Sequence, residues 1–225
     1  MVSVMNAANS VHYKTQIKIC GFTRPADAVS AVALGADSLG LVFYPPSPRH
    51  ISIEQALDIA AAVPPFTSFT ALFLNADSDA IERVLERIPV NLLQFHGTES
   101  AEFCQSFNRP YIKSVSMKST SDVMEYCAAY SEARGFLLDS NVAGAAGGSG
   151  DVFDWSLIPE STRVPLVLAG GLDVDNVRDA VFSVRPAAVD VSSGVESAKG
   201  IKDLTLMQRF IAQVKSVDEQ IANGQ

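Results

Sequence analysis

The sequence is poor in the residue types that several large classes of protein require. Its 225 residues include three cysteines, three histidines and one tryptophan, with 17 lysines and arginines against 25 aspartates and glutamates. The net charge of −8 disfavours a nucleic-acid-binding protein, because neutralising phosphates requires clustered basic residues. No apolar run approaches the roughly 20 residues that a membrane-spanning helix needs. We therefore expect a protein that binds neither nucleic acid nor membranes.

The cysteines and histidines are also too few for a disulfide scaffold or a metal site. The cysteines are Cys20, Cys104 and Cys127, and an odd number in a chain of this size indicates a reducing compartment, so a cytoplasmic protein is expected. No histidine or cysteine pair has ligand spacing, and no metal is predicted. A free cysteine is most often a small buried hydrophobe, which is our interpretation of Cys104 and Cys127 and the structural alternative for Cys20.

The sequence is rich in short apolar runs that alternate with amphipathic segments. Residues 1–16 precede this pattern and are interpreted as an N-terminal extension, which leaves residues 17–225 as one domain. Candidate strands begin near residues 17, 38, 67, 90, 110, 135, 165 and 187. Candidate helix starts are Pro25, Ser52 and Asp77, and residues 201–217 supply an eighth helix. Eight strand–helix units predict an α/β protein with a (β/α)8 TIM barrel, and a doubly wound open sheet is the alternative.

Strand parity places polar side chains together at one end of this barrel. Alternate residues of a strand point to opposite faces, and the faces that pack against helices must be apolar. The carboxyl ends of barrel strands are also where active sites lie. The polar side chains that parity directs inward at this end are Lys18, Cys20, Gln94, His96, Asp139, Asp190 and Ser192.

Several of these residues also have an ordinary structural interpretation. Lys18 could be the counter-ion of a buried acid, either Asp139 or Asp190. His96 precedes a glycine and could simply end its strand. Arg49 lies in a proline-rich loop, where an exposed and solvated arginine is the usual expectation.

Glycines mark the loops after the last three predicted strands. Gly144, Gly147, Gly148 and Gly150 follow the sixth strand, and the pattern is neither a Rossmann fingerprint nor a P-loop. The loops after barrel strands seven and eight commonly bind phosphate through backbone N–H groups, and glycine allows the anion a close approach. The predicted phosphate-binding residues are Gly170, Gly171, Ser192 and Ser193.

Seven motifs, in order and at barrel spacing, resemble the phosphoribosylanthranilate isomerase family of tryptophan biosynthesis. They are KICGFTR (18–24), SPR (47–49), QFHGTE (94–99), LLDS (137–140), GGSG with FDW (147–155), LAGGL (168–172) and VDVSSGVE (189–196). The resemblance covers about residues 17–212. It implies a cofactor-free Amadori rearrangement of a small-molecule substrate, carried out by a monomer or homodimer.

By this resemblance Cys20 is the general base and Asp139 is the general acid. The thiol has an ordinary pKa of roughly 8.5 and must become a thiolate, which a nearby cation such as Lys18 would favour. The acid must instead hold a proton. The expected substrate-binding residues are Arg49, His96 and Asp190, of which Arg49 would pair with the anthranilate carboxylate through two parallel hydrogen bonds.

Other functions of the same fold stay open. A histidine-pathway sugar-phosphate isomerase performs the same rearrangement but usually has an aspartate where Cys20 stands. Indole-glycerol-phosphate synthase needs further catalytic Lys and Glu residues and an N-terminal helical extension. A non-catalytic small-molecule-binding barrel is the third alternative, although the joint presence of Cys20, Asp139 and Arg49 speaks against it.

Overall fold

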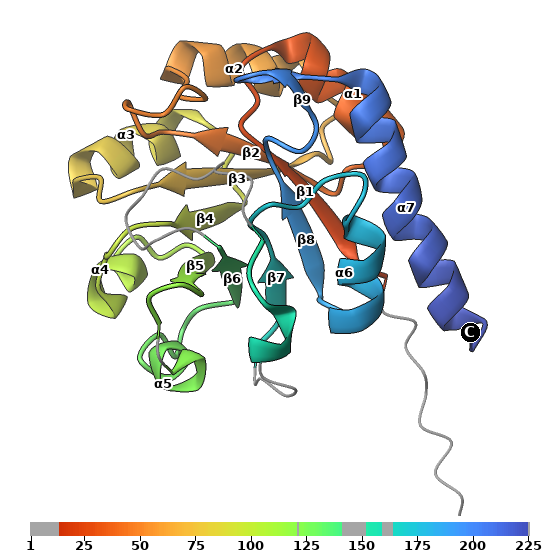
Figure 1. Cartoon of the computed structure of the whole chain (residues 1–225). Coiled ribbons are helices and arrows are strands. Elements are labelled where there is room, and N and C mark those ends of the chain that lie inside the picture. The colour runs from red at the N-terminus through yellow and green to blue at the C-terminus, as the bar shows by residue number, and fades with distance from the viewer. Residues whose placement is uncertain (1–13, 121, 141–151, 159–163, 225) are drawn as a thin grey trace, which may run out of the picture.

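Eight parallel strands close into a barrel in the computed structural model, which describes residues 14–120, 122–140, 152–158 and 164–224. Each strand pairs with its neighbours along the chain, and β1 pairs with β8 (Figure 1). The strands are β1 Gln16–Cys20, β2 Ser38–Val42, β3 Ser68–Phe73, β4 Leu92–Phe95, β5 Tyr111–Ser116, β6 Gly135–Asp139, β7 Leu166–Leu168 and β8 Ala188–Val191. The predicted (β/α)8 barrel is confirmed, and the open sheet is excluded.

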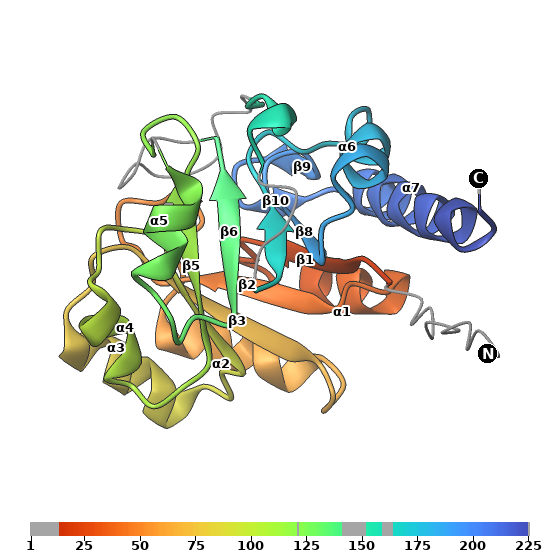
Figure 2. The same cartoon turned by 90° about the horizontal axis from the view of Figure 1, so that it is seen from below.

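Helices cover the outside of the barrel (Figures 1 and 2). They are α1 Pro25–Leu34, α2 Ile53–Ala62, α3 Ser78–Arg87, α4 Ala101–Gln105, α5 Val123–Ala128, α6 Val177–Val184 and α7 Leu204–Ala222, with a 3-10 helix, η1, over Trp155–Leu157. Pro25 starts α1, as predicted. The side chains of Ser52 and Asp77 cap α2 and α3 by accepting backbone N–H groups, also as predicted.

Two connections differ from the expected pattern of eight helices. Between β6 and β7, the described residues contain η1 and no α-helix. The helix expected over residues 201–217 begins at Leu204, because Ile201 and Lys202 form one strand of an antiparallel hairpin. This hairpin consists of β9 Glu196–Ala198 and β10 Ile201–Lys202. The Asp203 side chain then accepts a backbone N–H group and caps α7.

Apolar side chains fill both the space under the helices and the inside of the barrel. The larger cluster lies between strands and helices and includes the fully buried Ile17 and Ile19 of β1. A smaller cluster inside the barrel consists of Ile112, Leu137 and Ala169, with Leu92 and Val167 packed against it. Closer to the carboxyl ends of the strands, the side chains that point into the barrel are polar. These polar groups therefore pack against the smaller apolar cluster.

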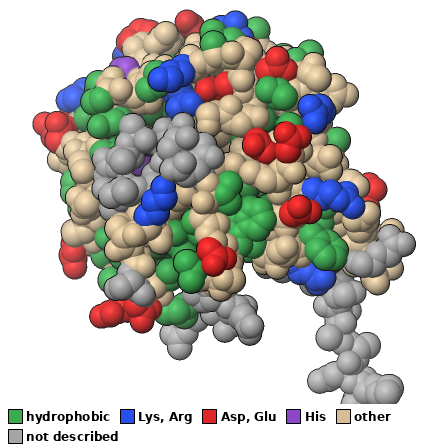
Figure 3. Space-filling view, viewed as in Figure 1, with side chains coloured by type: hydrophobic (Ala, Val, Ile, Leu, Met, Phe, Trp, Pro, Cys, Tyr) green, Lys and Arg blue, Asp and Glu red, His purple; other side chains and the backbone are tan. Residues whose placement is uncertain are grey.

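The surface of the barrel is mixed in character. On the face shown in Figure 3, Lys and Arg side chains are interspersed with acidic and apolar ones. Within the described ranges, no helix combines the length and apolar character that crossing a membrane requires.

Candidate active site

A pocket opens at the carboxyl ends of the strands, where strand parity predicted the polar residues. It is lined by both apolar side chains and a few convergent polar groups, which is typical of a site for a small-molecule ligand. Every predicted site residue lines it: Cys20, Arg49, His96, Asp139, Gly170, Gly171, Asp190, Ser192 and Ser193. Among the remaining lining residues are Gln94 and the apolar side chains Val42, Leu72 and Leu74. Residues from seven of the eight strands or the loops that follow them thus meet in one cavity.

Cys20 ends β1, and its side chain occupies space that β2 leaves open. Gly40 is its partner in the parallel ladder, and a Cβ at Gly40 would lie 2.7 Å from the Cys20 Sγ atom. Burial raises the pKa of the Cys20 thiol, and the charge of Asp190 adds to this, whereas Lys18 and Lys202 oppose it. Lys18 therefore favours the thiolate, as expected from the sequence, but burial outweighs it.

Asp139 ends β6 and faces His96, which follows β4. The His96 Nε2 atom lies 3.4 Å from Oδ2 of Asp139, and both side chains are buried. On its other side, the imidazole Nδ1 atom is 3.2 Å from Nε2 of Gln94. If Gln94 donates in this contact, Nδ1 is the acceptor and the imidazole proton sits on Nε2, directed at Asp139.

Lys18 and Asp190 form a buried ion pair between adjacent strands. They are direct partners in the β1–β8 ladder, and the Lys18 Nζ atom lies 2.8 Å from Oδ2 of Asp190. Burial disfavours the charge on Lys18, but Asp190 and Cys20 outweigh it and raise the lysine pKa. The structural interpretation of Lys18 as a counter-ion is confirmed, with Asp190 as its partner.

The pocket contains two buried acceptor atoms that the protein leaves without a hydrogen bond. Oδ1 of Asp190 and Oε1 of Gln94 find no partner among the described residues. A buried acceptor without a partner is costly, so these two oxygens are the places where the described residues leave the site unsatisfied.

The predicted phosphate loops approach each other at one side of the pocket. Gly170 and Gly171 have φ values of 78° and 67°, in the left-handed region that favours glycine. At Gly170 there is also no room for a side chain, because a Cβ would collide with the backbone nitrogen of Ser140. Ser192 is fixed by a 2.9 Å hydrogen bond from its Oγ atom to the Cys20 carbonyl oxygen. The glycine run 144–150 lies outside the described residues.

Arg49 departs from the expectation of a solvated loop residue, because it is only 7% exposed. Its Nε and Nη2 atoms donate to the two carboxylate oxygens of Glu196 at 2.8 and 2.9 Å. Burial opposes ionisation of Glu196, but Arg49 and Lys202 outweigh it and lower the glutamate pKa. Glu196 lies within the motif VDVSSGVE (189–196), but nothing in the sequence predicts a role for it. Its partner lies 147 residues away, a separation that no local pattern spans.

Within the described residues, no group of three or more His, Cys, Asp or Glu side chains is arranged to hold a metal ion. The site is instead a thiol and a carboxyl at different strand ends, two unpartnered acceptors, a buried guanidinium and two glycine- and serine-containing loops. Such a set can transfer protons and bind anions.

Comparisons with known proteins identify one family. Residues 17–213 match the family model described as N-(5′-phosphoribosyl)anthranilate isomerase. The chain is 49% identical over 208 residues to the N-(5′-phosphoribosyl)anthranilate isomerase of Dechloromonas aromatica, covering 92% of this chain and 100% of that protein. It is 52% identical over 205 residues to that of Leptothrix cholodnii, covering 91% and 93%.

Solved structures are similar as well. The crystal structure of phosphoribosyl anthranilate isomerase from Thermotoga maritima superposes with a TM-score of 0.82 at 41% identity, covering 90% of this chain and 99% of that one. A phosphoribosyl anthranilate isomerase in complex with reduced 1-(o-carboxyphenylamino)-1-deoxyribulose 5-phosphate gives a TM-score of 0.79 at 41% identity, with the same coverage.

Proposed function

The chain belongs to the N-(5′-phosphoribosyl)anthranilate isomerase family, and we propose that Cys20 and Asp139 perform the proton transfers of its reaction. The enzyme converts N-(5-phosphoribosyl)anthranilate to 1-(2-carboxyphenylamino)-1-deoxyribulose 5-phosphate, a step of tryptophan biosynthesis. The observation that carries our assignment is that one pocket holds a thiol at the end of β1 and a carboxyl at the end of β6.

Asp139 acts first in this proposal. Its carboxylic acid donates a proton to the ribose ring oxygen as the bond from that oxygen to the anomeric carbon breaks. The anthranilate nitrogen supplies the electron pair, which gives an open-chain iminium and leaves Asp139 as a carboxylate. The hydrogen on Nε2 of His96 then faces that carboxylate and stabilises it.

Cys20 acts in the second step. As a thiolate it removes the proton from the carbon next to the imine, and the electron pair neutralises the iminium nitrogen. The resulting enol tautomerises to the ketone, so the isomerisation involves no net oxidation or reduction. Lys18 and Lys202 are the cations that favour the thiolate against its burial.

The pocket also suggests an orientation for the substrate. Because Glu196 takes the Nε hydrogen and one of the two Nη2 hydrogens of Arg49, a carboxylate would meet the end of the guanidinium, at Nη1 and the second Nη2 hydrogen. The substrate phosphate would lie on backbone N–H groups of Gly170, Gly171, Ser192 and Ser193. His96 and Asp190 line the same pocket and remain the other expected substrate-binding residues. The anthranilate and phosphate ends would then bind to different loops.

Every residue to which we assign a role lies in this one chain, so the proposal requires no residue from a partner. One similar structure is described as monomers generated from the dimeric enzyme of Thermotoga maritima. We propose a monomer or homodimer here. The three cysteines are free, and the mechanism requires a reduced thiol at Cys20, which favours the cytoplasm as its location.

Turnover itself is the first test. Purified protein should accelerate the loss of phosphoribosylanthranilate fluorescence by several orders of magnitude over a protein-free control. Chromatography should show carboxyphenylamino-deoxyribulose phosphate as the product, which distinguishes isomerisation from spontaneous hydrolysis to anthranilate. A protein that leaves this substrate unchanged but isomerises the histidine-pathway sugar phosphate would instead support the alternative function.

Arg49→Ala should raise KM by about 10- to 100-fold, because a hydrogen-bonded charge pair with the anthranilate carboxylate is lost. An analogue without the carboxylate should lose little further affinity on this change. Inorganic phosphate should inhibit native and variant proteins equally, since its proposed site lies on other loops. Arg49→Lys is the matched control, because it keeps the charge but cannot form the two parallel hydrogen bonds of a guanidinium. Equal weakening of phosphate inhibition and substrate binding would reverse the proposed orientation.

A further inference from the structure

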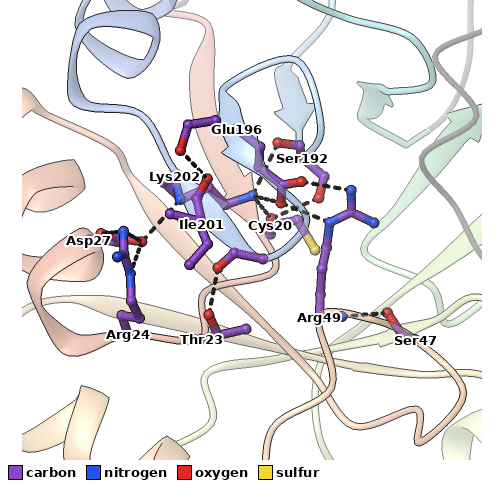
Figure 4. A network of polar contacts seen from close by, with 12 residues as sticks. Cys20, Thr23, Arg24, Asp27, Ser47, Arg49, Ser192, Glu196, Ile201 and Lys202 are labelled. Carbon is purple, nitrogen blue, oxygen red and sulfur yellow. Dashed lines mark hydrogen bonds and ion pairs between the residues drawn. The ribbon is translucent and has the colours of Figure 1, made fainter.

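The β9–β10 hairpin lies beside Cys20, Ser192 and Arg49 and connects them through hydrogen bonds (Figure 4). It is held against the loop after β1 and against α1. The Thr23 hydroxyl donates to the Gly200 carbonyl oxygen, and the backbone N–H of Lys202 donates to Oδ2 of Asp27 at 3.0 Å. Arg24 holds the same Asp27 carboxylate from the other side. The hairpin is therefore fixed in place independently of the Glu196 and Lys202 side chains.

The ammonium group of Lys202 has three acceptors, one for each of its hydrogens. It donates to the Cys20 carbonyl oxygen at 2.6 Å, to the Ser192 carbonyl oxygen at 3.1 Å and to Oε1 of Glu196 at 2.8 Å. The lysine is only 4% exposed. Since a lysine ammonium has no further hydrogen to donate, its position is fixed by these three groups.

Glu196 extends the same network to Arg49. Its two oxygens bind Nε and Nη2 of the guanidinium, so Glu196 sets the direction in which the free end of the guanidinium points. A fork of this kind has stricter geometry than a point-charge contact. One buried cation and one buried anion thus connect the end of β1, the loop after β8 and the proposed carboxylate anchor.

We propose that Lys202 and Glu196 are positioning residues of the isomerase, which fix Cys20, the Ser192 loop and Arg49 relative to one another. The proposal rests on the roles assigned above to Cys20 and Arg49. Neither residue needs to touch the substrate for this purpose. Stability alone is a poor reason for such a cluster, because apolar residues of similar volume often replace buried ion pairs without loss.

The charge of Lys202 adds a second effect. The charged groups around the Cys20 thiol come from several elements and are Lys18 on β1, Asp190 on β8, Lys202 on β10 and Arg49, held by Glu196 on β9. Lys202 is among the cations that hold down the pKa of Cys20 against burial. Removing it should therefore raise that pKa, and the acid limb of the kcat/KM profile should move to higher pH.

Lys202→Met tests the proposal, because methionine keeps much of the volume but removes the charge and the three hydrogen bonds. We expect the single-turnover rate constant to fall by about 10- to 100-fold. A loss of this size follows when reacting groups are misplaced by about an ångström. The pH dependence of Cys20 alkylation by iodoacetamide, resolved by peptide mass spectrometry, should shift upward in parallel. Lys199→Met, at an exposed lysine of the same hairpin, is the matched control and should leave both unchanged.

Two further variants separate positioning from a merely structural role. Lys202→Arg keeps the positive charge but changes the geometry of its hydrogen bonds. The acid limb of the kcat/KM profile of this variant should therefore stay near its native pH, even if kcat falls. Glu196→Gln removes an anion and should raise KM more than it lowers kcat, without moving the limb to higher pH. If Lys202→Met does not fold, these two variants decide the question by the same readouts.

The proposal is overturned if a folded Lys202→Met protein keeps the native kcat and acid limb, or if Glu196→Gln leaves KM unchanged. Activity of the native protein and its loss in a Cys20 variant are measured in the same assay. Failure of those two controls would contradict the proposed function instead, so the two failures are distinguishable.

Discussion

Cys20→Ala should lower kcat by on the order of 10²–10⁴ and change KM little, because it removes the base without removing a binding group. The thiol lines the pocket at the end of β1, and two buried lysines, Lys18 and Lys202, favour its ionised form. Alanine leaves the strand and its ladder with β2 and β8 intact. Single-turnover rates are the proper measure, since slow product release would mask part of the loss in steady state.

The other cysteines provide a control for this experiment. Cys127 lies on α5, half-buried and outside the pocket, and burial raises its pKa to about 11. Cys127→Ala should therefore keep the native single-turnover rate. A Cys20→Ala protein with the native rate, at a pH where chemistry limits turnover, would remove Cys20 from the mechanism.

The pH dependence of kcat/KM should reflect the burial of Cys20. A base must be deprotonated, so activity rises with pH through its pKa. Because burial raises the pKa of Cys20 above its ordinary value, the kcat/KM of the native enzyme should still be rising above neutral pH. This limb should be absent from the residual activity of Cys20→Ala.

The barrel and most of the pocket were predictable from local patterns. Apolar runs at regular spacing define the strands, and alternation within them decides which side chains face inward. The pair Lys18 and Cys20 illustrates this, since the isoleucines beside them are buried under the helices while both polar residues face the interior. Helix starts followed from proline and capping residues, whose action is local as well.

The features that escaped prediction depend on contacts between distant segments. Arg49 reads as a solvated loop residue until Glu196 comes to face it, and that carboxylate is in place only because the β9–β10 hairpin forms. The hairpin itself contains a two-residue strand, too short for any periodicity to reveal. Lys202 falls within the helix expected over residues 201–217, whereas in the structure it precedes α7 and its ammonium is buried against two backbone carbonyls. For both Arg49 and Lys202, the contacts that define their role form only in the folded protein. Composition and residue spacing therefore do not predict them.

Asp139→Asn should lower kcat by a factor similar to that of Cys20→Ala, on the order of 10²–10⁴. Asparagine fills the same space at the end of β6, but its amide cannot deliver the proton that opens the ribose ring. The neighbouring His96 can still reach the amide oxygen from Nε2, so the pocket should keep its shape and KM should change little. Asp175→Asn is the matched control, since the Asp175 side chain is 83% exposed, and it should change neither kcat nor KM.

His96 provides the decisive comparison for this assignment. Its Nε2 atom is 3.4 Å from Asp139, and both side chains line the pocket, so either could in principle present a proton to the sugar. If Asp139 is the acid, His96→Gln should cost less than Asp139→Asn, because glutamine can still donate to the carboxylate. The opposite order, with a nearly active Asp139→Asn and an inactive His96→Gln, would transfer the acid role to the imidazole. Asp139 would then act by orienting His96, as carboxylates do in catalytic pairs where the histidine carries the proton.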